Sequence, residues 1–306
     1  MAQGASTYRR LILGTVILFV VALLLFWPSR RSERVSGYEI DWREGIGLVE
    51  IGGLILDSDR LVGLIDAYGS RDDVRGILVD IDSPGGGVVA SDEIYRALKR
   101  TREEDGKPVV AYLGSVAASG GYYVACAADS IIAHPASITG SIGVIAEFPV
   151  ARELLERIGL RWQVLTSGPF KDMGSPFSEP TRQQLAWFQE VIDDTYAQFL
   201  DVVVEGRDMT EEHARTYADG RIFTGRQAAG WGFADRMGDR VDAVAAVGRM
   251  AGLGEDPRLI EPRSPPGLTL WDVLLGRAGA GDLMDAAARR LGLGPTDGPR
   301  VRYLMR

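Results

Sequence analysis

Short apolar segments alternate with amphipathic segments between residues 46 and 250. Residues 76–82 and 108–113 are rich in Val, Ile and Leu, as is typical of strands buried on both faces of a parallel sheet. The pattern predicts strands over 47–52, 76–82, 108–113, 130–133 and 162–166, and helices over 58–69, 90–102, 149–158, 180–205 and 241–251. Repeated alternation of strands and helices predicts an α/β fold built on a parallel sheet.

The expected helix over 180–205 is unusually long and carries one apolar stripe. Its members are Leu185, Phe188, Val191, Ile192, Tyr196, Phe199 and Val203. Such a stripe normally packs against the core of its own domain. It could equally line a groove or form a contact between subunits, and the sequence leaves these alternatives open.

Residues 11–27 form an uncharged apolar run that predicts a transmembrane helix. At ~1.5 Å per residue the run reaches about 25 Å, which is short but sufficient if the flanking arginines extend to the membrane surface. A cleavable signal peptide is the alternative, but no small-x-small cleavage site follows the run. An uncleaved signal-anchor is therefore favoured. Arginines flank both ends of the run, so charge does not settle its orientation.

Four segments follow from these patterns. Residues 1–27 hold the transmembrane signal-anchor and 28–45 form a polar linker. Residues 46–253 form the α/β domain, and 254–306 form a tail with frequent Pro and Gly and one short amphipathic stretch over 283–291.

Charge and the scarcity of metal-ligating residues exclude several classes of function. The net charge of −8 argues against nucleic acid as a partner, and no Walker-type or dinucleotide-binding glycine motif is present. The single cysteine, Cys126, lies in an apolar run and is expected to be buried. His134 and His213 lack the spacing of a zinc site, so we expect neither a metal nor a cofactor. Two histidines also disfavour a Ser-His-Asp triad.

Lysine is rare in this chain, with three lysines against 31 arginines. A buried lysine can lose its proton and act as a general base, whereas an arginine effectively cannot. Lys171 lies in a segment bounded by Gly, Ser and Pro, and Ser119 lies upstream between small residues that leave its hydroxyl accessible. The two residues are predicted to form a Ser-Lys dyad. A solvent-exposed loop lysine and a closely packed helix start are the plainer alternatives for each residue alone.

Acyl transfer also needs donors for the developing oxyanion. The glycines of residues 84–87 can present backbone amides in conformations that only glycine adopts easily, although a tight turn between strand and helix would explain them too. A helix beginning at Ser119 would add its own amides, including that of Gly120. A hydroxyl such as that of Ser141 could orient the lysine amine.

Four motifs together resemble the signal peptide peptidase A family of membrane-anchored Ser-Lys peptidases, which have a crotonase/Clp-protease type of fold. They are residues 82–91 (Asp-Ser-Pro-Gly-Gly-Gly-Val-Val-Ala-Ser), 116–123 (Val-Ala-Ala-Ser-Gly-Gly-Tyr-Tyr), 138–144 (Ile-Thr-Gly-Ser-Ile-Gly-Val) and 171–177 (Lys-Asp-Met-Gly-Ser-Pro-Phe). The resemblance covers about residues 46–250, with one copy of the catalytic unit. It implies Ser119 as nucleophile, Lys171 as general base, Ser141 as the orienting hydroxyl, and Gly86 with Gly120 as oxyanion donors.

The resemblance also implies a function and a setting. The expected substrates are remnant signal peptides or other short apolar peptides, cut in or near the cytoplasmic membrane by a domain on its extracytoplasmic side. The short members of the family close into a ring or dome, so a homo-oligomer is expected. The alternatives are a Ser-Lys protease that acts on other membrane proteins, a crotonase-fold acyl-CoA enzyme, and a non-catalytic membrane scaffold. The tail after residue 254 matches no pattern of the family.

Overall fold

The computed structural model describes residues 32–35, 38–41, 43–262 and 301–304. The apolar run 11–27 and the amphipathic stretch 283–291 lie outside these residues, as does most of the tail. Within the described part, no helix combines the length and the apolar character needed to cross a membrane.

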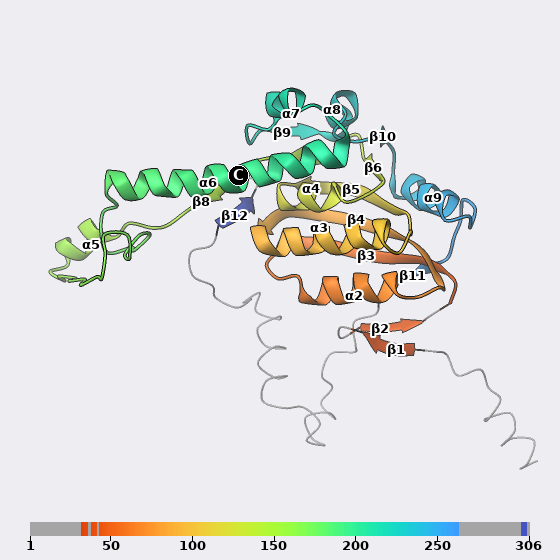
Figure 1. Cartoon of the computed structure of the whole chain (residues 1–306), viewed down its shortest axis with the longest axis horizontal. Coiled ribbons are helices and arrows are strands. Elements are labelled where there is room, and N and C mark those ends of the chain that lie inside the picture. The colour runs from red at the N-terminus through yellow and green to blue at the C-terminus, as the bar shows by residue number, and fades with distance from the viewer. Residues whose placement is uncertain (1–31, 36–37, 42, 263–300, 305–306) are drawn as a thin grey trace, which may run out of the picture.

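Six parallel strands form the centre of the sheet (Figure 1). They are β3 (Gly45–Ile55), β4 (Val74–Gly87), β5 (Val109–Ala118), β6 (Ser130–Ala133), β10 (Arg236–Met237) and β11 (Leu259–Ile260). Along the sheet they run in the order β10-β6-β5-β4-β3-β11, and every pairing among them is parallel. The prediction of a mixed α/β fold with a largely parallel sheet is confirmed.

Side chains that alternate along the strands supply a hydrophobic core on each face of the sheet. Ile77 and Val79 of β4 face the larger core, whereas Leu78 between them faces the smaller one. The larger core is covered by α2 (Asp59–Gly69), α3 (Val88–Glu103) and α4 (Gly120–Ala125). The smaller core is covered by α9 (Arg240–Met250). Burial on both faces explains why these strands are almost wholly apolar in sequence.

Shorter elements extend the sheet beyond the central strands. β7 (Ile138–Gly140) continues beside β5 and pairs with β9 (Ile222–Thr224), which leads into α8 (Gly225–Trp231). β12 (Val301–Leu304) lies between β4 and β8 (Ile145–Ala146), antiparallel to both. Ordered structure therefore continues past the expected tail boundary at residue 254, first in β11 and then in β12.

Two further segments differ from expectation. The linker contains a hairpin of β1 (Ser32–Val35) and β2 (Tyr38–Asp41). The predicted strand over 162–166 is wrong, because these residues form no regular structure. Trp162, Val164 and Leu165 are exposed there and have no neighbouring strand to complete a ladder.

An arm projects from the domain (Figure 1). We define the arm as residues 147–198, which include α5 (Arg152–Arg157) and most of α6 (Arg182–Arg207). Thr181 and Gln184 form a capping box that begins α6 one residue after Thr181. The apolar stripe of α6 divides in two: Phe199 and Val203 are buried in the domain core, whereas Leu185 and Val191 are exposed on the arm.

Candidate active site

Ser119 lies on a sharp turn between β5 and α4. Its φ is 53°, a left-handed conformation that is uncommon for a residue other than glycine. Two backbone hydrogen bonds hold the turn: the Ser119 amide donates to the carbonyl of Gly140 at 2.8 Å, and the Tyr123 amide donates to the carbonyl of Ser119 at 2.8 Å. Such strain at a non-glycine residue is characteristic of functional sites.

The hydroxyl of Ser119 is buried without a hydrogen-bond partner in the described part of the chain, a property it shares there with Ser137. Leaving a buried hydroxyl unpaired costs about 1–3 kcal/mol, so most proteins avoid it unless the group serves a purpose. The Ser119 hydroxyl is free to react with a group brought to it.

Gly86 and Gly120 lie next to each other beside this serine. A Cβ added to Gly120 would lie 3.2 Å from the amide nitrogen of Gly86 and would overlap the hydroxyl of Ser91. A Cβ added to Gly86 would overlap the carbonyl oxygen of Ile55 on β3. Both positions therefore require glycine for lack of space, and the close packing brings the two predicted oxyanion donors together.

The glycine segment 84–87 forms the end of a strand and not a separate turn. β4 extends to Gly87 and pairs there with Leu54 and Ile55 of β3. Gly85 has a φ of 101°, which a side chain would disfavour, and its amide donates to the hydroxyl of Ser83 at 3.1 Å. The glycines thus present a strand edge without side chains.

Ser141 follows β7 in the same way that Ser119 follows β5. Ala118 and Gly140 are register partners in these parallel strands, so Ser119 and Ser141 occupy equivalent positions at their ends. Ser141 also has a positive φ, 52°, and its amide donates to the carbonyl of Arg221 at 2.8 Å. Four of the five predicted site residues therefore meet at one edge of the sheet.

Lys171 lies elsewhere, on the arm. Its loop is attached to the first turn of α6, where the side-chain amide of Gln184 donates to the carbonyl of Pro169 at 2.6 Å and to Asp172 at 2.9 Å. Lys171 itself is exposed, and within the described residues its amine has no hydrogen-bond or ion-pair partner.

Contact between α6 and the active-site helix is made much further along α6. The ring of Phe199 lies 5.1 Å from that of Tyr123 on α4. Fifteen residues separate Gln184 from Phe199, and at ~1.5 Å per residue this is about 22 Å along the helix axis. A single chain thus does not bring Lys171 to Ser119.

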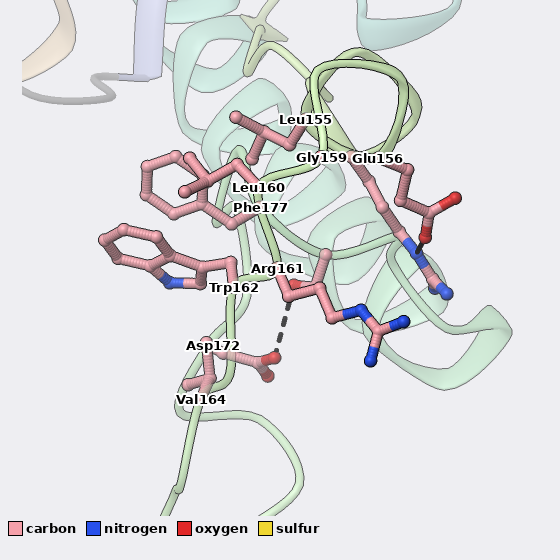
Figure 2. A pocket seen from close by; sticks show the side chains of 11 residues that line it. Leu155, Glu156, Gly159, Leu160, Arg161, Trp162, Val164, Asp172 and Phe177 are labelled. Carbon is pink, nitrogen blue, oxygen red and sulfur yellow. Dashed lines mark hydrogen bonds and ion pairs between the residues drawn. The ribbon is translucent and has the colours of Figure 1, made fainter.

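The arm carries a pocket of its own near the Lys171 loop (Figure 2). Figure 2 shows the stacked rings of Trp162 and Phe177, whose centroids are 4.2 Å apart, with Asp172 in the same wall. None of the residues that line this pocket belongs to the Ser119 cluster. The pocket is a feature of the arm surface rather than part of the Ser119 site.

The remaining reactive side chains lie away from Ser119 in structural positions. Cys126 is buried as predicted, and burial raises the pKa of its thiol to about 12. His134 directly follows β6, and His213 lies in α7 (Glu211–Tyr217), where its Nε2 lies 2.7 Å from the carbonyl oxygen of Trp231. Among the described residues, no three His, Cys, Asp or Glu side chains are grouped so that they could hold a metal ion.

Two features of this region had no signal in the sequence. One is β12, whose four residues lie far along the chain from their partners on β4 and β8. The other is the separation of Lys171 from Ser119, because a stripe of apolar residues does not reveal which part of a helix leaves the domain.

Comparison with known proteins identifies relatives. The model of peptidase family S49 matches residues 101–254. The chain is 38% identical to a putative protease of Synechocystis sp. over 76% of this chain and 80% of that protein. It is 33% identical to a putative protease of Methanocaldococcus jannaschii over 67% of this chain and 65% of that protein. It is 37% identical to a putative signal peptide peptidase SppA of Enterococcus faecium over 57% of this chain and half of that protein.

Proposed function

Because this chain belongs to peptidase family S49, the signal peptide peptidase A family, and is a serine peptidase, we propose that it degrades remnant signal peptides with a Ser-Lys dyad. The observation that carries the proposal is the unpaired Ser119 hydroxyl, held on a left-handed turn beside the Gly86 and Gly120 amides. A nucleophile and two adjacent donors are the parts that acyl transfer requires.

The proposed reaction has two stages. The neutral amine of Lys171 takes the proton of the Ser119 hydroxyl as Oγ attacks the peptide carbonyl carbon. The amides of Gly86 and Gly120 donate to the resulting oxyanion, and Ser141 orients the lysine amine. The tetrahedral intermediate expels the peptide amine, which receives the proton from Lys171. Water, activated by the same lysine, then hydrolyses the acyl ester and frees Ser119.

A second copy of the chain would supply the lysine. The arm holds Lys171 far from the serine of its own chain, so the dyad is complete only if the arm reaches a neighbouring copy. The arm also carries exposed apolar side chains: Leu154, Ile158, Leu160, Trp162, Leu165, Leu185, Trp187 and Val191. An apolar surface of this extent is characteristic of a contact between proteins. A head-to-tail ring would bury it and pair each Ser119 with the neighbour's lysine.

The membrane setting is part of the same proposal. Residues 11–27, which lie outside the described structure, would anchor the chain, with the peptidase domain on the extracytoplasmic side of the cytoplasmic membrane. Remnant signal peptides are apolar and remain in the membrane after processing. An anchored ring whose active sites face inward would admit extended peptides and exclude folded proteins.

A protease that acts on other membrane proteins is the second candidate, because the same Ser119 site would serve it. Membership of a peptidase family replaces the acyl-CoA enzyme and the non-catalytic scaffold considered from sequence.

The test uses the full chain purified in detergent and three substrates: a synthetic signal peptide, an intact membrane protein, and a tightly folded soluble protein. Mass spectrometry should show cleavage within the apolar core of the signal peptide only, and none with the Ser119→Ala variant. Cleavage of the membrane protein with the signal peptide left intact would overturn the substrate proposal in favour of the second candidate.

A further inference from the structure

The described end of the chain, β12, lies against the glycine edge of the active site (Figure 1). Arg302, Tyr303 and Leu304 are the register partners of Gly87, Gly86 and Gly85, in the antiparallel sense. A strand formed by the tail of the chain thus runs past the two amides proposed to bind the oxyanion, of which Gly86 is one.

The other edge of β12 is also paired. Val301 and Arg302 are the register partners of Ala146 and Ile145 on β8, again antiparallel. The tail strand therefore lies between two strands and completes the sheet where a gap would otherwise separate them. The last register pair between β4 and β5 is Ser83 with Ala117, so β12 takes the place beside β4 that β5 leaves when it turns into Ser119.

This arrangement has the properties of a peptide-binding groove. An extended peptide that adds to a sheet edge is held by main-chain hydrogen bonds, which do not depend on its sequence. Glycines at the edge allow close approach of the peptide backbone, and two flanking strands offer twice the hydrogen bonds of one edge. The groove ends beside Ser119, because Gly86 is adjacent to Gly120.

We propose that this groove is a binding site for an extended peptide and that residues 301–304 of the same chain are its resident ligand, competing with peptide substrates. The occupancy is independent of catalysis, whereas the competition rests on the function proposed above. A flexibly tethered segment has an effective concentration on the order of 1 mM. If a free strand of this length binds with a Kd of about 0.1 mM, the tail raises the apparent KM about tenfold.

Cross-linking tests the occupancy in the full chain. Ala146→Cys combined with Val301→Cys places cysteines at register partners, and Cα atoms of paired strands lie within disulfide range. We expect a rapid disulfide within one chain upon mild oxidation, since the native Cys126 is buried and its pKa is raised to about 12. The control pair is Glu153→Cys with Val301→Cys, because Glu153 lies on α5 of the arm. Equal rates for the two pairs, or disulfides only between chains, would overturn the proposal.

Kinetics test the competition. A chain that ends at residue 300 should hydrolyse a short peptide with a KM about tenfold lower and an unchanged kcat. Arg302→Pro should behave like the truncation because proline removes an amide donor from the strand, whereas Arg302→Ala keeps that amide and should behave like the parent chain. Identical KM values for the truncated and parent chains would overturn the competition while leaving the peptidase function intact. A disulfide between residues 146 and 301 without hydrolysis of any peptide would instead support the occupancy and contradict the proposed function.

Discussion

The side-chain amide of Gln184 donates a hydrogen bond of 2.9 Å to Oδ1 of Asp172, and so attaches the Lys171 loop to the start of α6. The same carboxylate accepts from the hydroxyl of Ser178 at 3.3 Å. Asp172 is thus engaged with neutral groups, although it directly follows Lys171 in sequence. The loop and the helix end form one unit that would present Lys171 to a neighbouring active site.

Gln184→Glu is expected to lower kcat with little loss of stability. The new carboxylate cannot donate to Asp172 and repels it, so the Lys171 loop loses its attachment to α6. Losing a hydrogen bond to a charged group costs about 1.5–3 kcal/mol, which corresponds to a fall in rate of roughly tenfold or more. Gln189→Glu is the matched control, because Gln189 makes a similar bond to Asp193 on the exposed surface of the same helix. Steady-state kinetics in which both variants lose activity equally would contradict this role of the loop.

The glycines beside Ser119 should not tolerate alanine. Gly86→Ala would force a Cβ against the carbonyl of Ile55, and Gly120→Ala would force one against Ser91. Overpacking of this kind typically costs about 1–3 kcal/mol and displaces the amides, so we expect lower thermal stability together with loss of peptide hydrolysis. Gly52→Ala is the control, since a Cβ at Gly52 meets nothing within 4 Å. Full activity in Gly86→Ala would exclude its amide from the oxyanion site.

Sequence alone could predict most of this site because its parts follow strands of one parallel sheet. Ser119, Ser141 and Gly86 lie at the carboxyl ends of β5, β7 and β4, and the carboxyl ends of parallel strands meet at one edge. The strand expected over 162–166 failed because its apolar residues have no partner within the chain. The pairing of β12 with Gly85–Gly87 could not be foreseen either, since a four-residue strand far from its partner has no local pattern.

Leu165→Glu should disrupt assembly without unfolding the chain. Leu165 is 90% exposed on the arm, so a charge there costs little in the isolated chain, and surface substitutions usually change stability by about 0.5 kcal/mol or less. Buried in a contact between copies, the same charge would be strongly unfavourable. Sedimentation velocity should show smaller species and assays should show lost activity. Val241→Glu, at a site 73% exposed on α9, should change neither. An unaltered oligomer in Leu165→Glu would exclude this part of the arm from the contact.

Cys126 should resist alkylation until the domain unfolds. With its pKa raised to about 12 by burial, only about one thiol in ten thousand is ionised at pH 8, and the thiolate is the reactive form. An unfolded thiol has a pKa near 8.5. Protonation therefore contributes stability that is complete below about pH 8.5 and is lost as the pH rises toward 12. Iodoacetamide labelling followed by mass spectrometry should track thermal unfolding, and the alkaline loss of stability should be smaller in Cys126→Ala. Rapid labelling of the folded chain at pH 8 would contradict this burial.

Mixing two inactive variants should restore peptide hydrolysis, because the serine and the lysine of one dyad would come from different copies. Ser119→Ala lacks the nucleophile, and Lys171→Ala lacks the base, so each alone should be inactive. Lys171→Arg should be as inactive as Lys171→Ala, since a guanidinium retains its proton. If copies exchange at random in a head-to-tail ring, about a quarter of the sites in a 1:1 mixture combine an intact Ser119 with an intact Lys171. Denaturing and refolding the two variants together should therefore recover about a quarter of the parent activity, whereas refolding them separately before mixing should recover none. The double variant mixed with the parent chain provides the control, because it dilutes active sites and creates none. Failure of the mixture to recover activity, with co-assembly shown by a tag on one variant, would mean that Lys171 serves the serine of its own chain after a movement of the arm.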